Sequence, residues 1–155
     1  YLIDNDIKVK LFGPPKNWYD NIKIEYRIKL EPISYATLND YVNIINKAKI
    51  CLAFFSKLNR DNYTRRVFEI TSSNGFMISE RNSTMKQLFR ENMEAVYFET
   101  KEELLLKIKY YLENNDERNK IANNGYFRCI NSNYSVDDKA NQVIQDINRI
   151  QLNNF

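Results

Sequence analysis

The sequence predicts an α/β fold in which helices cover both faces of a parallel sheet, and three observations support this prediction. Short apolar runs typical of buried strands alternate along the chain with segments of helical period. The connections between them are short, as in folds whose parallel strands are joined by right-handed helical crossovers. Hydrophobic residues make up 43% of the 155-residue chain, which is enough for the core of one domain.

The first two predicted elements are strands. We interpret IKVKLFG (7–13) as a strand that ends at Gly13, followed by the loop PPKNW, because Pro14 and Pro15 cannot continue a strand ladder. In IKIEYRIKL (22–30), apolar and polar residues alternate with the period of two that is typical of a half-buried strand. This segment therefore predicts a strand, which suits the edge of the sheet.

The next predicted element is a helix that begins near Ser34, where Ser34 or Thr37 can cap its first turn. Its apolar residues recur with the helical period and share one face: Leu38, Tyr41, Val42 and Ile45. The run KICLAFF (49–55) that follows is continuous and apolar, which is typical of a strand covered on both faces.

The motif RRVFEITSSNGFMISER (65–81) predicts a helix, a turn and a strand. Thr64 can cap a helix over 64–73, and the Asn-Gly pair at 74–75 can stop it. The apolar run FMIS (76–79) then forms the strand.

One more helix and one more strand follow. Ser83 can cap a helix that extends to Glu91, and AVYF (95–98) is the last predicted strand. The alternation of strands and helices indicates a Rossmann-like α/β sandwich, a fold that by itself says little about activity.

The C-terminal third of the chain predicts helices alone. The capping box Thr-Lys-Glu-Glu (100–103) begins a helix over 101–113. Two further helices span 116–132 and 135–152, and Gly125 can bend the first of them. The apolar stripe of the helix over 101–113 consists of Leu104, Leu105, Ile108 and Leu112.

Charge and cysteine content exclude several classes of protein. With 23 basic and 20 acidic residues, the net charge of +3 does not predict binding to nucleic acid or to a membrane surface, so any anion site is local. Cys51 and Cys129 are too scattered for a metal site or a disulfide framework, and reduced thiols indicate the cytoplasm. No apolar stretch approaches the ~20 residues of a membrane span, and the opening YLIDNDIKVK lacks the features of a signal peptide.

Common phosphate-binding and metal-binding motifs do not occur in the sequence. Gly13 is not followed by the spaced glycines of a Walker loop or of a dinucleotide-binding fingerprint. The early aspartates Asp4, Asp6 and Asp20 do not form a convincing carboxylate cluster, so we expect no bound metal. Packing explains most of the 11 tyrosines, so we do not expect base stacking.

Candidate binding residues follow the strands, because ligands of open parallel sheets bind outside the carboxyl ends of the strands. Cations at a helix N-terminus oppose the macrodipole by roughly 0.3–1 kcal/mol each, whereas a bound phosphate would accept hydrogen bonds from both the helix amides and the guanidinium groups. The alternative is that one arginine pairs with Asp61 and another is solvated. The segment SKLNRDNYTRR (56–66) places four cations before and inside the first turn of a helix: Lys57, Arg60, Arg65 and Arg66.

Glu69 lies one helical turn beyond Arg65 and Arg66, within an otherwise apolar segment. At the lip of a pocket, its carboxylate could accept two hydrogen bonds from a vicinal diol such as that of ribose. An exposed helical glutamate and a salt bridge to Arg66 are the alternatives, and the spacing leaves them open.

Several motifs resemble the C-terminal half of glycosyltransferases of the CgeB (spore maturation protein) type, which are members of the GT-B superfamily. The resemblance is carried by YTRRVFEI, GFMISER and AVYFETKEELLLKIKYYLENNDERNKIANNGY, and it extends to IKVKLFGPPKNW and SYATLNDYVNIINKAKICLAFF. It therefore covers nearly the whole chain. The family usually has Pro-Ala-Cys-Gly after Phe-Glu-Ile, whereas this chain has the residues 71–74 before Gly75, so the glycine is kept and the proline is lost.

The resemblance implies a donor-binding domain that faces a second Rossmann-like domain across a cleft. It implies that Glu69 binds the ribose of a nucleotide-sugar donor and that Arg65 and Arg66 contact its diphosphate as catalytic residues. It also implies that Gly13 and Pro14 belong to a loop facing the donor. The acceptor-binding N-terminal domain is not part of residues 1–155, and any catalytic histidine would lie elsewhere because this chain has none.

Two functions follow from these observations. The first is the donor-binding domain of a sugar transferase that glycosylates a cell-surface polymer, lipid or protein, with a nucleotide-diphosphate sugar as substrate and no cofactor. Lys57 and Arg60 are weaker candidates for the same diphosphate, and the domain alone is expected to bind nucleotide weakly and to turn over little. The alternative is a noncatalytic Rossmann-like module for protein interaction or oligomerisation.

Overall fold

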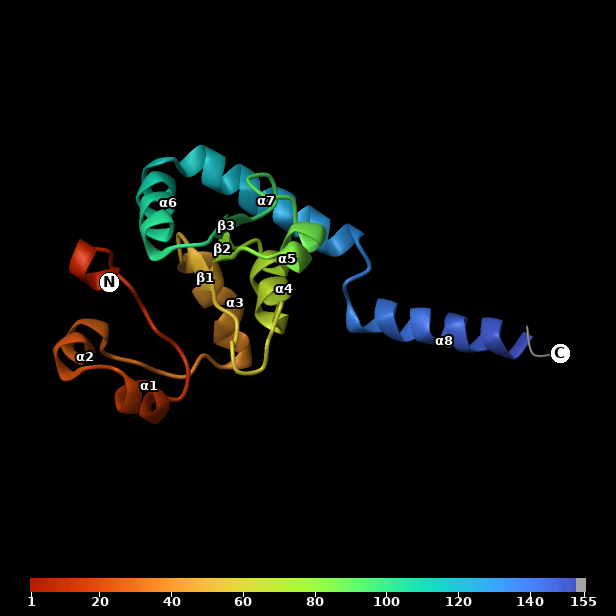
Figure 1. Cartoon of the computed structure of the whole chain (residues 1–155), viewed down its shortest axis with the longest axis horizontal. Helices are drawn as coiled ribbons and strands as arrows, with labels where there is room; N and C mark the ends of the chain where they lie inside the picture. Colours follow the sequence, from red (N-terminus) through yellow and green to blue (C-terminus); the bar gives the residue numbers. More distant parts are fainter. Residues whose placement is uncertain (153–155) are drawn as a thin grey trace.

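The computed structural model describes residues 1–152, apart from the side chains of Leu38, Asn39 and Leu152. The predicted apolar position Leu38 therefore lies outside the described side chains. Figure 1 shows the helices and strands in their order along the chain. Their bounds are η1 Ile3–Asn5, α1 Pro15–Asn21, α2 Ile24–Leu30, α3 Leu38–Lys47, β1 Cys51–Ala53, α4 Arg65–Ser72, β2 Met77–Glu80, α5 Ser83–Leu88, β3 Val96–Phe98, α6 Lys101–Glu113, α7 Asn115–Asn131 and α8 Val136–Leu152.

The three strands form one parallel sheet in the order β1-β2-β3. In this sheet Ala53 lies opposite Ser79, and Glu80 lies opposite Phe98. The predicted strands over 49–55, 76–79 and 95–98 are thus confirmed, although each paired span is shorter than its apolar run.

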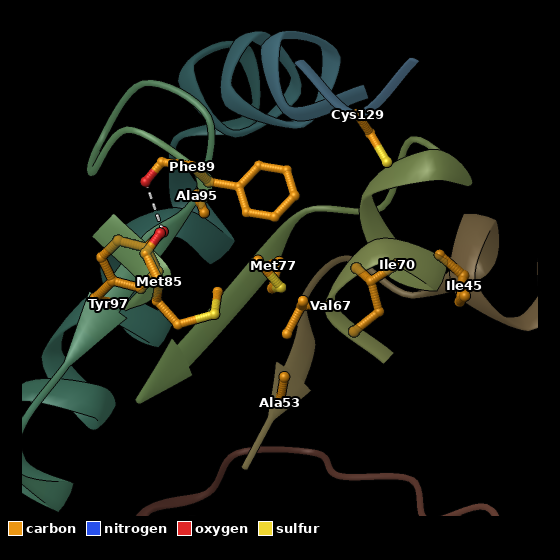
Figure 2. Packing of buried hydrophobic residues seen from close by; sticks show 10 residues of the cluster. All are labelled: Ile45, Ala53, Val67, Ile70, Met77, Met85, Phe89, Ala95, Tyr97 and Cys129. Atoms are coloured by element: carbon orange, nitrogen blue, oxygen red, sulfur yellow. Dashed lines mark hydrogen bonds between the residues drawn. The ribbon is translucent and has the colours of Figure 1, made fainter. Parts of the chain in front are cut away.

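Helices cover both faces of the sheet, as the sequence predicts. On one face, Val67 and Ile70 of α4 pack with Met77 of β2 and Tyr97 of β3, and Figure 2 shows this cluster from close by. The Tyr97 hydroxyl donates to the carbonyl oxygen of Phe89 at 2.7 Å. The cluster on the other face consists mainly of strand, α6 and α7 residues: Phe76, Ile78, Val96, Phe98, Leu104, Ile108, Tyr111, Ile121 and Ala122.

The helix α7 crosses the amino ends of the strands from one face to the other. Its Ile121 belongs to the cluster beside α6, and its Cys129 belongs to the cluster beside α4. Between them, a Cβ atom at Gly125 would lie 2.4 Å from the backbone oxygen of Glu94. Gly125 therefore permits close packing, and α7 continues as one helix from Asn115 through Asn131.

The predicted strand over 22–30 is wrong. Residues Ile24–Leu30 form the helix α2 instead, with Leu30 buried while Ile24 and Ile28 are 68% and 77% exposed. A period of two stabilises a strand only where a neighbouring strand pairs with its backbone and side chains. In the described part of the chain, no strand lies beside this segment.

The predicted strand over 7–13 and the loop after it are also wrong. The first segment makes a single isolated bridge between Phe12 and Ser34, and PPKNW opens the helix α1. Pro15 occupies the first position of α1, where its fixed φ angle suits a helix and its missing N–H is not needed.

The remaining helices agree with the sequence apart from details at their ends. Thr37 and Thr64 precede α3 and α4, although neither side chain makes a capping hydrogen bond. The predicted helix from Ser83 to Glu91 ends earlier, at Leu88, and its cap is Asn82, whose side chain accepts from the Met85 amide at 2.8 Å. Thr100 caps α6 by accepting from the Glu103 amide at 3.1 Å, as predicted.

The C-terminal helix α8 projects away from the rest of the molecule in Figure 1. None of its described residues belongs to either core cluster. No described helix combines the length and apolar character that crossing a membrane requires. The exposed apolar residues of α8 include Val136, Val143, Ile144, Ile147 and Ile150.

Candidate functional site

The carboxyl edge of the sheet is the place where the predicted binding segments meet. The strands end at Ala53, Glu80 and Phe98, and the chain then continues into loops or the start of a helix. The amide nitrogen Nδ2 of Asn82, after β2, donates to the backbone oxygen of Asn62 at 2.8 Å. This hydrogen bond holds the segment before α4 against the end of the central strand.

The N-terminus of α4 carries two exposed arginines, Arg65 and Arg66, and no acidic residue in its first turn. Thr64 adopts an extended conformation, and its side chain does not cap the helix. The first amides of a helix have no partner within the helix, so those of Arg65 and Arg66 are donors that an incoming anion can use, whereas the Val67 amide donates to the Thr64 oxygen at 3.1 Å. This end of α4 is therefore electropositive in both its backbone and its side chains.

Glu69 is held by two groups. Nε of Arg65 lies 2.7 Å from its Oε1 atom, and the Tyr41 hydroxyl donates to its Oε2 atom at 3.1 Å. The pairing with Arg65 differs from the alternative of a bridge to Arg66. Because Arg65 is 89% exposed, this ion pair contributes little to stability, and a ligand can displace it at small cost.

Tyr41 of α3 joins the candidate site and was missed by sequence reasoning. Burial raises the pKa of its hydroxyl above the ordinary value, Arg66 opposes this shift, and Glu69 adds to it. The hydroxyl thus remains a proton donor that orients the Glu69 carboxylate. The sequence places Tyr41 on the apolar face of the predicted helix. It does not show that Glu69, 28 residues away, is the hydrogen-bond partner of Tyr41.

The other predicted cations lie on the loop between β1 and α4. Lys57 and Arg60 are exposed, and Arg60 has a left-handed φ angle of 55°. Among the described residues, neither cation forms an ion pair, and Asp61 does not pair with an arginine. Lys57 and Arg60 therefore remain available to an anion. Arg65, the first residue of α4, is held only by its exposed ion pair with Glu69.

Gly13 and Pro14 form hydrogen bonds with residues other than those at the start of α4. Gly13 has a φ angle of 137°, a conformation that favours glycine, and its amide donates to the Ser34 oxygen at 3.0 Å. Pro14 precedes α1, and its oxygen accepts from the Trp18 amide at 3.4 Å. Their hydrogen bonds thus run within the N-terminal segment rather than to α4.

Arg81 sits at the centre of an ionic network just after β2. Its guanidinium contacts Glu91 at 2.5 Å, Glu99 at 3.1 Å and Glu103 at 3.0 Å. These contacts, chiefly the hydrogen bond with Glu91, raise the pKa of Arg81 above its ordinary value. The network ties the end of β2 to the start of α6 and leaves Arg81 with little capacity for a ligand.

A cavity of about 170 Å³ lies at the opposite, amino edge of the sheet. Lys47, Lys49 and Arg118 are among its lining residues, and Arg118 donates to the Tyr111 oxygen near the end of α6. Ligands of parallel α/β sheets bind at the carboxyl ends of strands, so we place the candidate site at the edge that carries α4.

A family model described as glycosyl transferase-like matches residues 2–145 of the chain. The chain belongs to the glycosyl transferase-like family. This match includes the whole sheet and the helices α1 to α7, and it supports the C-terminal domain of a GT-B glycosyltransferase. A sugar donor is the partner that the glycosyl transferase-like family implies. No curated protein matches the sequence.

Proposed function

We propose that this chain is the donor-binding domain of a CgeB-type glycosyltransferase that transfers a sugar from a nucleotide-diphosphate sugar. The single observation that carries the proposal is the N-terminus of α4 at the carboxyl edge, where Arg65 and Arg66 stand beside the Tyr41-bound Glu69. The acceptor is a cell-surface polymer, lipid or protein, and the reaction takes place in the cytoplasm.

The arginines and the helix amides would bind the diphosphate. As the bond between the sugar and the diphosphate breaks, negative charge grows on the leaving group, and fixed positive groups stabilise it without a metal ion or other cofactor. Arg65 would exchange its exposed bond with Glu69 for a phosphate oxygen. Lys57 and Arg60 would add to the positive field from the preceding loop.

Glu69 would bind the ribose. Once Arg65 turns to the diphosphate, the Glu69 carboxylate can accept hydrogen bonds from the two ribose hydroxyls while Tyr41 keeps it in place. The loop of Gly13 and Pro14 would face the donor. An N-terminal acceptor-binding domain or a partner chain would complete the cleft, so residues 1–155 alone are expected to show weak binding and little turnover.

Titration with UDP, GDP and ADP, followed by calorimetry or chemical shifts, tests this proposal. We expect saturable binding of at least one of them at millimolar concentration, weakened about tenfold in Glu69→Ala and in Arg65→Ala, because each variant loses a charge-assisted contact worth about 1.4 kcal/mol. Arg149→Ala is the matched control, because Arg149 is also exposed and paired with a nearby acid but lies on α8.

An absence of response to all three nucleotides would contradict the proposal. It would favour the noncatalytic interaction module instead. Binding that is equally strong in Glu69→Ala and Arg65→Ala would place the nucleotide somewhere other than the start of α4.

A further inference from the structure

A row of three side chains crosses the carboxyl edge of the sheet, on the face that α6 covers. Glu80 and Phe98 are register partners on β2 and β3. Phe54 follows Ala53, whose partner is Ser79, so Phe54 lies next to Glu80 on the other side. Since side chains alternate along a strand, Phe54, Glu80 and Phe98 all point to the same face.

The two aromatic rings of this row form a supported apolar surface. The ring centroids of Phe54 and Phe98 are 5.9 Å apart, with an interplanar angle of 72°. Phe98 is only 6% exposed, whereas Phe54 is 55% exposed. An edge-to-face contact with a buried ring restrains Phe54, so part of its surface is presented to solvent in a defined orientation.

Glu80 occupies the middle register position of this row, and most of its hydrogen-bonding capacity is unused. Its Oε2 atom accepts from the Phe55 amide at 3.4 Å, which is a long hydrogen bond. Among the described residues it forms no ion pair, because the neighbouring Arg81 is already occupied by Glu91, Glu99 and Glu103. A half-buried carboxylate can accept several hydrogen bonds, so Glu80 retains acceptors for a ligand.

This row reaches the same carboxyl edge as the proposed diphosphate site, with its side chains on the face that α6 covers and α4 on the other face. The hydrogen bond from Asn82 to the Asn62 oxygen joins the residues just after Glu80 to the residues just before α4. A sugar attached to a diphosphate at the start of α4 would reach this row by crossing the carboxyl edge from the face of α4 to the face of α6. It would meet an aromatic surface and a carboxylate, which together suit a pyranose ring with apolar C–H faces and hydroxyl groups around its rim.

We propose that Phe54 and Glu80 form the subsite for the donor's sugar and that they select a neutral hexose over a hexuronate. This inference rests on the proposed function. The C–H face of the hexose lies on Phe54, and its hydroxyls donate to the Glu80 carboxylate. A uronate would bring a second carboxylate close to Glu80, and like charges at short range disfavour binding.

The selectivity is measured by titrating the chain with UDP, UDP-glucose and UDP-glucuronate, or with GDP, GDP-mannose and GDP-mannuronate where GDP is the tighter nucleotide. We expect the hexose form to bind about threefold or more tighter than the diphosphate alone, and the uronate form to bind about tenfold weaker than the hexose form. The diphosphate alone reports on the α4 site, and the two sugars report on Phe54 and Glu80.

Two variants separate the roles of the aromatic ring and the carboxylate. Glu80→Gln should reduce the hexose-to-uronate ratio to about threefold or less, since the isosteric amide carries no charge. Phe54→Ala should reduce the affinity for the hexose form to that for the diphosphate. Phe127→Ala is the control, because Phe127 is similarly exposed, at 50%, but lies on α7. All three variants should bind the diphosphate as the parent chain does.

The outcomes distinguish this inference from the proposed function. If the diphosphate binds but the hexose and uronate forms bind equally in the parent chain, the inference is wrong and the proposed function stands. If Glu80→Gln keeps the full discrimination, Glu80 is not its source. If neither nucleotide series binds, both are overturned.

Discussion

Arg81 shows how a charged residue is accommodated at the edge of this sheet. Its side chain is 19% exposed, and desolvating a guanidinium is unfavourable unless acids and hydrogen bonds surround it. Glu91, Glu99 and Glu103 supply the acids, and the Arg81 amide donates to the Phe98 oxygen at 2.8 Å. The residue therefore binds three segments together rather than a ligand.

Glu103 makes this network sensitive to acid. The ammonium of Lys107, 2.7 Å away, is the main reason that the pKa of Glu103 falls to about 2, and the Glu99 amide and Arg81 add to the shift against the effect of burial. In the unfolded chain the pKa is about 4.3. Glu103 thus stabilises the fold above about pH 4.3, and this contribution is lost as the pH falls toward about 2.

We therefore expect Glu103→Gln to be less stable than the parent chain at pH 7 and the difference to shrink progressively below about pH 4. Urea unfolding midpoints at pH 7, 5 and 3 measure this change. Glu102→Gln is the control, since Glu102 is in the same turn, is 60% exposed and pairs with Lys101 only at 3.8 Å. A constant difference between Glu103→Gln and the parent chain at all three pH values would contradict the assignment.

The site residues differ in how far the sequence could predict them. Glu69 and Arg65 lie four residues apart on one helix, so their proximity follows from the helical period alone. Tyr41 comes from another helix, and the row of Phe54, Glu80 and Phe98 depends on the register of three strands. Contacts of this kind are set by tertiary packing, which a single sequence does not specify.

Helices of similar length differ in how they are held in this chain. The helices α7 and α8 each have 17 residues, but among their described side chains only those of α7 belong to the core clusters. The helices α1 and α2 have seven residues each and bury only Leu30. Helices this short are marginal in water, so tertiary packing has to supply most of their stability.

Hydrogen–deuterium exchange is expected to follow packing rather than helix length. Backbone amides of α1, α2 and α8 should exchange at least about 100-fold faster than the central amides of α6 and α7, because local opening there breaks few buried contacts. Peptides from α7 and α8 provide the comparison at equal length, and mass spectrometry measures it. Equal protection of α7 and α8 would mean that α8 is covered in solution.

Local signals explain which elements the sequence predicted correctly. The strands over 49–55 and 95–98 are continuous apolar runs, and the box at 100–103 marks the start of α6 through hydrogen bonds between near neighbours. The segment 22–30 carries an equally clear alternation but forms α2. A strand needs a partner, and whether one is available is not encoded in the segment itself.

The two ends of the strands differ in how they are covered. The helix α7 covers the amino ends of the strands, where Asn124 donates to the Met93 oxygen at 3.0 Å. The carboxyl ends continue into the loop before α4 and the turn after β2. This asymmetry agrees with the carboxyl edge as the place of the proposed nucleotide site, and the described residues of α8 contribute to neither edge.

Removal of α8 is therefore expected to leave the fold intact. A chain that ends at Ser135 keeps Tyr134, which packs against the core, and should unfold within about 2 °C of the parent chain. A chain that ends at Asn124 loses Gly125 and the buried Cys129, and it should not fold cooperatively. Thermal unfolding followed by circular dichroism measures both, and a decrease of more than about 5 °C for the first chain would show that α8 supports the core.

The projection of α8 also affects how the molecule rotates. The helix α8 extends nearly along the longest axis of the molecule (Figure 1). End-over-end rotation is therefore slower than spinning about the long axis. Peptide N–H bonds of a helix lie nearly parallel to its axis, so spinning about that axis hardly reorients those of α8. The nuclear spin relaxation of the α8 amides would therefore depend on the slow end-over-end rotation alone. The relaxation of amides at other angles to the long axis would depend on both rotations.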